Sequence, residues 1–256
     1  MIKIGPAEER LLRVVSGSGA AHLTLIDPDS QSPELAGQMA EEAARGGTDG
    51  IMVGGSVGAS GAVLTETVSR IKALTDLPVI LFPSSVAGLC DNADAVFFMS
   101  LLNTRSTSYL IENQAMGAPL VLRYGIEPIP MAYIIIEPGG TVAWVGDAKR
   151  IPRSKPELAV AYALAGKYLG MRVVYLEAGS GADSPVPAAM VGAVKRALGD
   201  TLLIVGGGVR SGDAASALVK AGADIIVTGT AVEKSSDVTS FVLEVTRAIK
   251  QDSLGQ

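Results

Sequence analysis

Eight short apolar runs recur along the chain, and most of them are followed by a longer stretch with helical spacing. This alternation constrains the fold more than any other feature of the sequence. Most of the runs are continuously apolar, which is typical of strands buried on both faces in a parallel sheet. The runs lie at residues 21–27, 50–55, 78–82, 95–100, 132–137, 172–178, 202–207 and 224–228. The helical stretches lie at residues 33–46, 62–75, 107–116, 156–169, 187–198, 212–221 and 237–250.

Proline and glycine mark where these helices begin and end. Pro33 and Pro156 stand at helix starts, where a missing N–H costs nothing, and Gly46 and Gly170 stand at helix ends. Strands and helices that alternate in this way, with right-handed crossovers, close into a (β/α)8 TIM barrel. An open doubly wound sheet is the alternative, but no G-x-G-x-x-G motif follows the first strand. A length of 256 residues suits one barrel, so we expect residues 1–256 to form a single domain.

Two segments depart from the regular repeat. The link at residues 82–95 is short and rich in Pro, Ser and Gly, so the third outer helix is missing or altered, unless the loop is merely trimmed. The segment 139–153 is long for a loop that follows a barrel strand and is rich in Gly and basic residues. Because such loops lie at the catalytic end of a barrel, this segment is a candidate lid.

Composition excludes several classes of protein. The net charge of −5 argues against a nucleic-acid partner, because no basic tract neutralises a phosphate backbone. The single cysteine, Cys90, excludes an internal disulfide framework and fits a reducing cytoplasm. The N-terminus lacks a signal pattern, and no apolar run approaches the ~20 residues of a membrane span. We therefore expect a cytoplasmic protein without a transmembrane segment.

Glycines gather after the last two apolar runs. Gly206, Gly207 and Gly208 lead into a helix, and Gly229 precedes Thr230 after the final run. Barrels commonly bind phosphate at this place, because bare main-chain amides can approach the ligand and helix N-termini present unpaired N–H groups. Tight turns alone would also explain the glycines. The pattern predicts a small phosphorylated ligand without specifying a reaction.

Glu177 ends the sixth run, and Gly179, Ser180 and Gly181 follow it. A carboxylate at this end of a buried strand has a raised pKa and suits a general base. The structural alternative is a carboxylate held by a cation or by loop amides. The three following residues would extend the phosphate site.

Asp27 ends the first run, where an unpaired buried charge would be costly. Mg²⁺ is a natural partner for this carboxylate, and Ser56 brings a hydroxyl to the neighbouring strand end. Asp29 is either a second ligand or part of the following turn. His22, the single histidine, lies near the start of the same strand and is expected to pack in the core.

Segments 22–29, 48–56, 126–149, 151–170, 175–181 and 206–210 together resemble the geranylgeranylglyceryl phosphate synthases, a family that also contains heptaprenylglyceryl phosphate synthases. The stretches YLEAGSG and EPGGTVAWVGDAKRIPRSKPELA are the most specific, and the longer, group II-like branch fits best. The resemblance implies a Mg²⁺-dependent prenyltransferase that joins the C3 hydroxyl of sn-glycerol 1-phosphate to a long-chain prenyl diphosphate, with geranylgeranyl diphosphate expected. It also implies a homo-oligomer, a dimer or larger.

The resemblance assigns roles to individual residues. Asp27 and Ser56 would hold the metal, and Glu177 would take the proton from the glycerol hydroxyl. Residues for glycerol phosphate would be Tyr175, Leu176, Glu177, Ala178, Gly179, Ser180, Gly181, Gly207, Gly208, Gly229 and Thr230. An altered third unit is also a feature of that family, and such a gap would let an apolar chain leave the barrel sideways. Tyr109 and the Phe97–Phe98 pair are candidates for the side chain that limits prenyl length.

Two positions depart from the family pattern. Ser30 stands where members have Lys, which would weaken diphosphate binding, and Thr230 stands where many have Asn. Two rival functions remain at this stage. One is another phosphate-binding barrel isomerase or synthase, in which Asp27 would act without metal. The other is a barrel that binds phosphorylated metabolites without turning them over.

Overall fold

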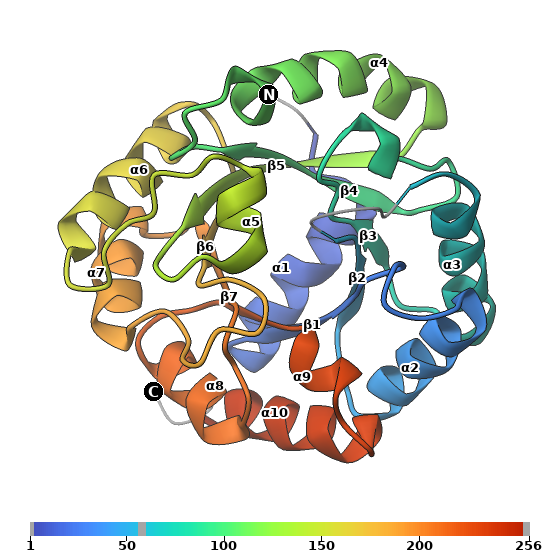
Figure 1. Ribbon diagram of the computed structural model, residues 1–256. Coiled ribbons are helices and arrows are strands. Elements are labelled where there is room, and N and C mark those ends of the chain that lie inside the picture. Colours follow the sequence, from blue (N-terminus) through green and yellow to red (C-terminus); the bar gives the residue numbers. More distant parts are fainter. Residues whose placement is uncertain (1–2, 56–59, 253–256) are drawn as a thin grey trace.

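The structure is a computed structural model that describes residues 3–55 and 60–252. Eight parallel strands pair in chain order, and β8 pairs with β1, so the sheet closes into a barrel (Figure 1). This confirms the expected (β/α)8 TIM barrel, and the open doubly wound sheet is wrong. The strands are β1 (Ala21–Ile26), β2 (Gly50–Val53), β3 (Val79–Leu81), β4 (Ala95–Leu101), β5 (Glu127–Ile135), β6 (Val173–Glu177), β7 (Leu202–Gly206) and β8 (Ile225–Thr228).

Helices cover the outside of the barrel (Figure 1). Several begin as the sequence predicted, for example α2, where Pro33 takes the first position and the Ser32 side chain accepts a hydrogen bond from the Leu35 amide. The helices are α1 (Pro6–Ser18), α2 (Pro33–Arg45), α3 (Gly61–Leu74), α4 (Asn113–Tyr124), α5 (Gly140–Val145), α6 (Pro156–Tyr168), α7 (Ala188–Leu198), α8 (Gly212–Lys220), α9 (Thr230–Glu233) and α10 (Val238–Asp252).

Apolar side chains pack on both faces of the sheet, as the uninterrupted apolar runs predicted. One cluster fills the barrel interior and includes Leu23, Met52 and Ile204. Two further clusters lie between the sheet and the helices, with Val191 of α7 and Val68 of α3 among their members. These layers fix the strand ends, and with them the residues that follow each strand.

The third outer helix is replaced, as expected from the sequence. Between β3 and β4 the chain forms only the short 3₁₀ helix η1 (Val86–Gly88). After β4, the helical turn η2 (Ser108–Glu112) leads into α4, which contacts η1. The helical ring is therefore thin on this side of the barrel.

Two elements are longer than expected. β5 begins at Glu127, before the expected start at residue 132, although it contains Pro128 and Pro130, and proline is disfavoured within sheets. The pairing of β5 with β6 begins only at Met131. No residue of β6 therefore needs a hydrogen bond from the N–H groups that Pro128 and Pro130 lack. α4 continues past Gly117 to Tyr124, so the expected end at residue 116 is wrong.

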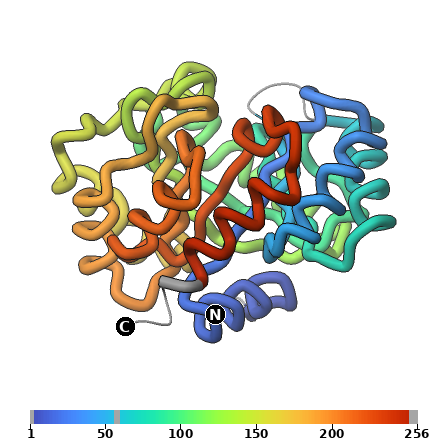
Figure 2. Tube along the Cα trace, turned by 90° about the horizontal axis from the view of Figure 1, so that it is seen from below, coloured from blue at the N-terminus to red at the C-terminus, as the bar shows by residue number. Residues whose placement is uncertain are grey.

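Helix α1, which the sequence analysis missed, closes the N-terminal end of the barrel (Figure 2). Its Leu11 packs with the barrel interior. The Glu127 carboxylate accepts hydrogen bonds from the first amides of the helix, and buried Glu8 pairs with Arg172 at 2.6 Å. Ligands must therefore reach the barrel at its opposite, C-terminal end, where the strands finish. Within the described residues, no helix is long and apolar enough to span a membrane.

Candidate active site

Two adjoining cavities lie at the C-terminal ends of the strands. With space open to solvent included, one cavity is about 1330 Å³ and the other about 1100 Å³, and we call them the larger and the smaller cavity. The larger cavity reaches from Asp27 to the gap between η1 and α4. The smaller lies over the ends of β6, β7 and β8. Both are lined by Glu177, Ser180 and Thr230. A ligand in one cavity therefore meets a ligand in the other at Glu177.

Glu177 is the last residue of β6 and is 6% exposed. Its Oε1 accepts a hydrogen bond from the Gly179 amide at 2.6 Å, and its Oε2 accepts one from the Tyr133 hydroxyl at 3.3 Å. Burial raises the pKa of the carboxyl, while hydrogen bonds from Gly179, Tyr175 and Tyr133 oppose the rise. Glu177 forms no ion pair within the described residues. The arrangement suits a proton acceptor held in a fixed orientation.

The glycines of the smaller cavity are required by its geometry. Gly207 and Gly208 have positive φ angles of 80° and 73°. A Cβ on Gly207 would lie 2.4 Å from Glu177 Oε1, and one on Gly208 would lie 2.6 Å from the Ser184 main chain. Only glycine fits both positions, which leaves their main chain bare toward the cavity.

Side chains complete the smaller cavity. Thr230 Oγ1 lies 2.7 Å from Ser180 Oγ. Thr230, which stands where many family members have Asn, therefore links the ends of β6 and β8 through its hydroxyl. Arg210 and Lys234 also line the cavity, and Arg210 donates to the Gly181 carbonyl. The sequence analysis missed both cations, although Arg210 stands only two residues after Gly208. Bare amides with flanking cations make a site for an anion such as phosphate.

The remaining expected ligand residues differ in what they present to a ligand. Tyr175 lines the smaller cavity, although it is only 1% exposed and packs in the barrel interior, where its hydroxyl hydrogen-bonds to Glu177. Leu176 and Ala178 point the other way and pack against the helices. Gly229 precedes α9 and lines both cavities. For Leu176 and Ala178, only the main chain is left for a ligand.

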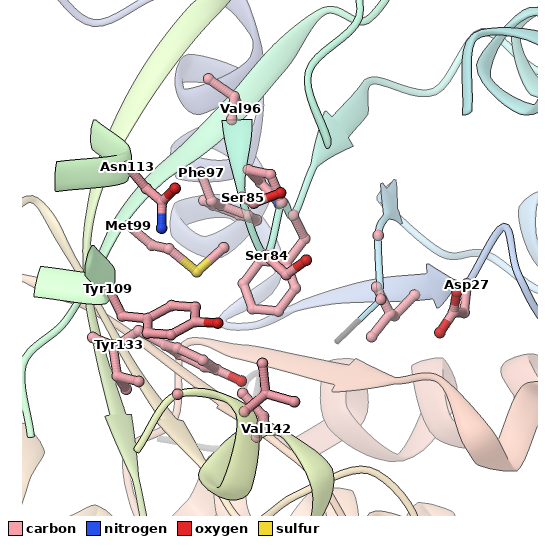
Figure 3. Close-up of a pocket in the computed structure, with 18 of the residues that line it drawn as sticks. Asp27, Ser84, Ser85, Val96, Phe97, Met99, Tyr109, Asn113, Tyr133 and Val142 are labelled. Carbon is pink, nitrogen blue, oxygen red and sulfur yellow. The ribbon is translucent and has the colours of Figure 1, made fainter. Parts of the chain in front are cut away.

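Asp27 lies in the wall of the larger cavity, across from Tyr109 and Asn113 (Figure 3). Its Oδ1 accepts the Asp29 amide, and its carboxylate lies directly over Gly55, whose Cβ would be 2.3 Å away. Burial raises the pKa of the Asp27 carboxyl, and the nearby charge of Asp29 adds to the rise. Asp29 itself is exposed and closes the turn, which is the second of the two roles considered for it. Ser56, the other expected metal residue, lies outside the described residues.

A second carboxylate, missed by the sequence analysis, lies beside Asp27. Glu233 is half-buried at the end of α9 and lines the same cavity. Burial raises its pKa and the charge of Asp27 raises it further, while the Asp27 amide donates to it. Mg²⁺ prefers oxygen ligands and is held by one or two carboxylates. Asp27 and Glu233 are two neighbouring carboxylates, so the residues present fit this ion.

The larger cavity continues as an apolar groove toward the thin side of the helical ring. Phe97 lies inside the barrel and is fully buried, whereas Phe98 lies on the outer face of β4. Both line the cavity, as does Tyr109, so all three candidates for the length-limiting side chain border it. Figure 3 shows Phe97 and Tyr109 among the lining residues. The groove is also lined by Val86 of η1, by Leu89, which follows η1, and by Gly117 and Val121 of α4.

The candidate lid at residues 139–153 contains α5, which lies across the barrel mouth (Figure 1). Val142 of α5 lines the larger cavity. Two sets of contacts hold the segment in place. Asp147 forms an ion pair with Arg105, and Arg153 donates hydrogen bonds to the Glu137 and Pro185 carbonyls. It therefore forms part of the cavity wall. His22, by contrast, is buried between two threonine hydroxyls, and its pKa falls to about 3 because burial disfavours the charged ring.

The chain is similar to known proteins over nearly its whole length. The model of the PcrB family matches residues 13–247. A geranylgeranylglyceryl phosphate synthase of Methanothrix thermoacetophila is 69% identical over 248 residues, which cover 97% of each chain. A geranylgeranylglyceryl phosphate synthase of Methanosarcina barkeri is 62% identical and covers 95% of this chain and 99% of its own.

A solved structure has the same architecture. It is the (S)-3-O-geranylgeranylglyceryl phosphate synthase of Thermoplasma acidophilum in complex with its substrate sn-glycerol-1-phosphate. The two chains share 45% identity and superpose with a TM-score of 0.93 over 97% of this chain and 100% of the other. The resemblance seen in the sequence is confirmed. The chain belongs to the PcrB family.

Proposed function

We propose that this protein is a prenyltransferase that joins the C3 hydroxyl of sn-glycerol 1-phosphate to a long-chain prenyl diphosphate. Geranylgeranyl diphosphate is the expected donor, diphosphate is released, and the product carries the first ether bond of an archaeal-type membrane lipid. The observation that carries the proposal is the position of Glu177, buried in the wall shared by a phosphate-type cavity and an apolar groove. An isomerase or synthase of small phosphorylated molecules would have no use for such a groove.

Glycerol phosphate fits the smaller cavity. Gly207 and Gly208 line it without side chains, and Arg210 and Lys234 add positive charge. The structure of the Thermoplasma acidophilum relative supports glycerol phosphate as the ligand, since it is a complex with sn-glycerol-1-phosphate. With the phosphate at the ends of β7 and β8, the glycerol hydroxyls extend toward Glu177 on the neighbouring strand β6.

The prenyl donor fits the larger cavity. Its hydrocarbon tail would run along the apolar groove and leave the barrel between η1 and α4, where the outer helix is replaced. Its diphosphate would lie near Asp27, with Ser30 also in the cavity wall. Such a groove buries a long apolar chain, and burial contributes roughly 0.8 kcal/mol for each CH₂ group removed from water.

We propose Mg²⁺ as the cofactor, held by Asp27 and Ser56, with Glu233 close by. When bound, Mg²⁺ neutralises charge on the diphosphate and so favours its departure. The chain itself supplies the remaining steps. Glu177 accepts the proton of the C3 hydroxyl, while the Gly179 amide and the Tyr133 hydroxyl hold its two oxygens in place.

The test is turnover with sn-glycerol 1-phosphate, radiolabelled geranylgeranyl diphosphate and Mg²⁺, with a chelator control. We expect an organic-extractable prenyl ether that forms only when free metal is present. Binding of glycerol phosphate without a product from any prenyl diphosphate would reject the prenyltransferase and leave a phosphate-binding barrel.

The homo-oligomer and the cytoplasmic location expected from the sequence stay predictions. The apolar side chains Ile111, Met116 and Leu122 are more than half exposed on η2 and α4, which favours self-association through this surface. Sedimentation velocity is the direct measurement, and we expect a mass at least twice the 26.2 kDa of one chain.

A further inference from the structure

An aromatic cluster stands where the two cavities meet. Phe82 directly follows β3, and its ring centroid lies 5.3 Å from that of Tyr133 and 5.6 Å from that of Tyr175. Phe82 stacks on Tyr175 at 27° and meets Tyr133 edge-on at 86°. The two tyrosines are buried in the barrel, whereas Phe82 is half-buried and lines the larger cavity.

The position of Phe82 coincides with the point where the reacting parts of the proposed substrates must meet. The diphosphate end lies toward Asp27, the nucleophile toward Glu177, and the tail toward the groove that begins at Ser84 and Val86. Phe82 borders the same cavity as all three, and both of its aromatic neighbours hydrogen-bond to Glu177. The allylic carbon of the donor therefore passes next to this ring.

We propose that Phe82 is a catalytic residue whose aromatic face stabilises positive charge on the allylic carbon, with Tyr133 and Tyr175 holding the ring in place. The inference rests on the proposed function. In this step the bond between the allylic carbon and the diphosphate oxygen breaks, and its electron pair leaves with diphosphate. The oxygen of the glycerol C3 hydroxyl bonds to the carbon, and its proton goes to Glu177.

Aromatic faces suit this task physically. The negative face of a ring attracts a cation within about 6 Å of its centroid, and the attraction is stronger where water is absent. A phenylalanine has no lone pair that could capture the cation, so the glycerol oxygen remains the nucleophile. Burial raises the pKa of Tyr133 and Tyr175, and the nearby Glu177 raises it further, so both stay uncharged while Glu177 carries the negative charge.

The test replaces Phe82 with 4-fluoro-, 3,4-difluoro- and 3,4,5-trifluorophenylalanine in the full-length protein. Each fluorine weakens the negative face while the shape of the ring hardly changes. We expect the single-turnover rate at saturating substrates to fall in order with fluorine number, reaching roughly 2- to 30-fold, the range that a cation–π contact predicts. The KM for glycerol phosphate and the Tm should stay close to wild type.

Phe98 is the comparison position, because it borders the part of the cavity that would hold the uncharged tail. The same three substitutions there should change the KM for the prenyl diphosphate without an ordered fall in the single-turnover rate. Phe82→Leu and Phe82→Trp add a coarser check: Leu should slow the step and Trp should retain most of it.

The possible outcomes separate this inference from the proposed function. A flat rate across the Phe82 series, in a protein whose wild type turns over, would overturn the role of Phe82 alone. An equal ordered fall at Phe82 and Phe98 would also overturn it, because a general packing effect would then explain both. Absence of turnover in the wild type would instead reject the prenyltransferase itself.

Discussion

Glu177 combines a cost in stability with its proposed role as the base. The residue is 6% exposed, and among the described residues its carboxylate is held by an amide and by tyrosine hydroxyls. Burial disfavours the charged form, so the pKa rises above the ordinary glutamate range, and a base with a pKa nearer neutral accepts protons more effectively. Because of the same burial, the charged form of Glu177 destabilises the folded state.

Replacing Glu177 with Gln should therefore separate activity from stability. We expect turnover to fall by roughly 10²–10⁴, because the general base is lost. We expect the Tm at neutral pH to rise, by about 2–4 °C for each kcal/mol of relieved burial in a chain of this size.

The pH dependence of that Tm difference follows from the sign of the shift. The folded-state pKa of Glu177 is raised, so its cost is absent below the unfolded-state pKa, grows as the pH rises from that value toward the folded-state pKa, and is complete above it. Calorimetry from about pH 4 to pH 8 should show the two Tm values converging at acid pH. A Gln variant that is less stable at every pH would contradict this account.

Tyr133 tunes the base through its hydroxyl. Donation to Glu177 Oε2 favours the charged carboxylate and lowers its pKa, so Tyr133→Phe should raise that pKa further. The acid limb of kcat/KM should then move to higher pH, with a several-fold loss at about pH 6 that largely disappears at about pH 8.5. Tyr168→Phe is the matched control, because Tyr168 is 78% exposed. An equal loss at all pH values would mean that the hydroxyl only supports packing.

At the scale of elements, most of the barrel could be predicted from local pattern. Seven of the apolar runs became strands within a few residues of the expected bounds, because each strand is buried on both faces and carries its own signal. β5 differed because the cost of Pro130 depends on where β6 begins, which is not visible locally. Helix α1 was missed because Glu127 and Arg172, which hold it, are distant in sequence.

The site residues divide in the same way, into those that the sequence pattern reveals and those that only the fold reveals. Asp27, Glu177 and the phosphate glycines are visible because each ends an apolar run, and the structure brings them to one end of the barrel. Glu233, Arg210 and Lys234 lie in helical or loop segments with no such signal. Phe82 was read as the end of a strand, since only the fold shows it between two tyrosines.

The groove between η1 and α4 offers a test at this scale. Gly117 lines it, and a Cβ there would lie 3.4 Å from the Leu89 side chain, so a large residue would close the passage. With Gly117→Phe we expect kcat/KM for geranylgeranyl diphosphate to fall at least tenfold, on the order of the 1–3 kcal/mol that pocket-shape changes cost. The value for the shorter geranyl diphosphate should change by no more than about threefold.

Ala118→Phe is the control for this experiment, because Ala118 is a small residue on the same helix and is exposed. It should leave the ratio of the two kcat/KM values at the wild-type level. If Gly117→Phe lowers both donors equally, the tail does not leave the barrel between η1 and α4.

At the scale of the whole molecule, the barrel holds two cavities that share Glu177, Ser180 and Thr230. The proposed phosphate site is built from the ends of β6, β7 and β8, whereas the proposed metal site is built from the ends of β1 and β2. Each site relies on different groups, main-chain amides in one and carboxylate oxygens in the other. The two substrates should therefore bind with different requirements for metal.

Removing the metal should expose this division. With excess EDTA we expect turnover to stop, while sn-glycerol 1-phosphate at 100 times its Kd still raises the Tm by roughly 5–10 °C. A non-reactive thio analogue of the prenyl diphosphate should stabilise the protein much more with Mg²⁺ than without it. Asp27→Asn should behave like the chelated enzyme toward both ligands, whereas Asp29→Asn should behave like wild type, since Asp29 is exposed and lies outside the cavity wall. If EDTA also abolished the stabilisation by glycerol phosphate, the two sites would not be independent, and metal would have to be placed at the phosphate end.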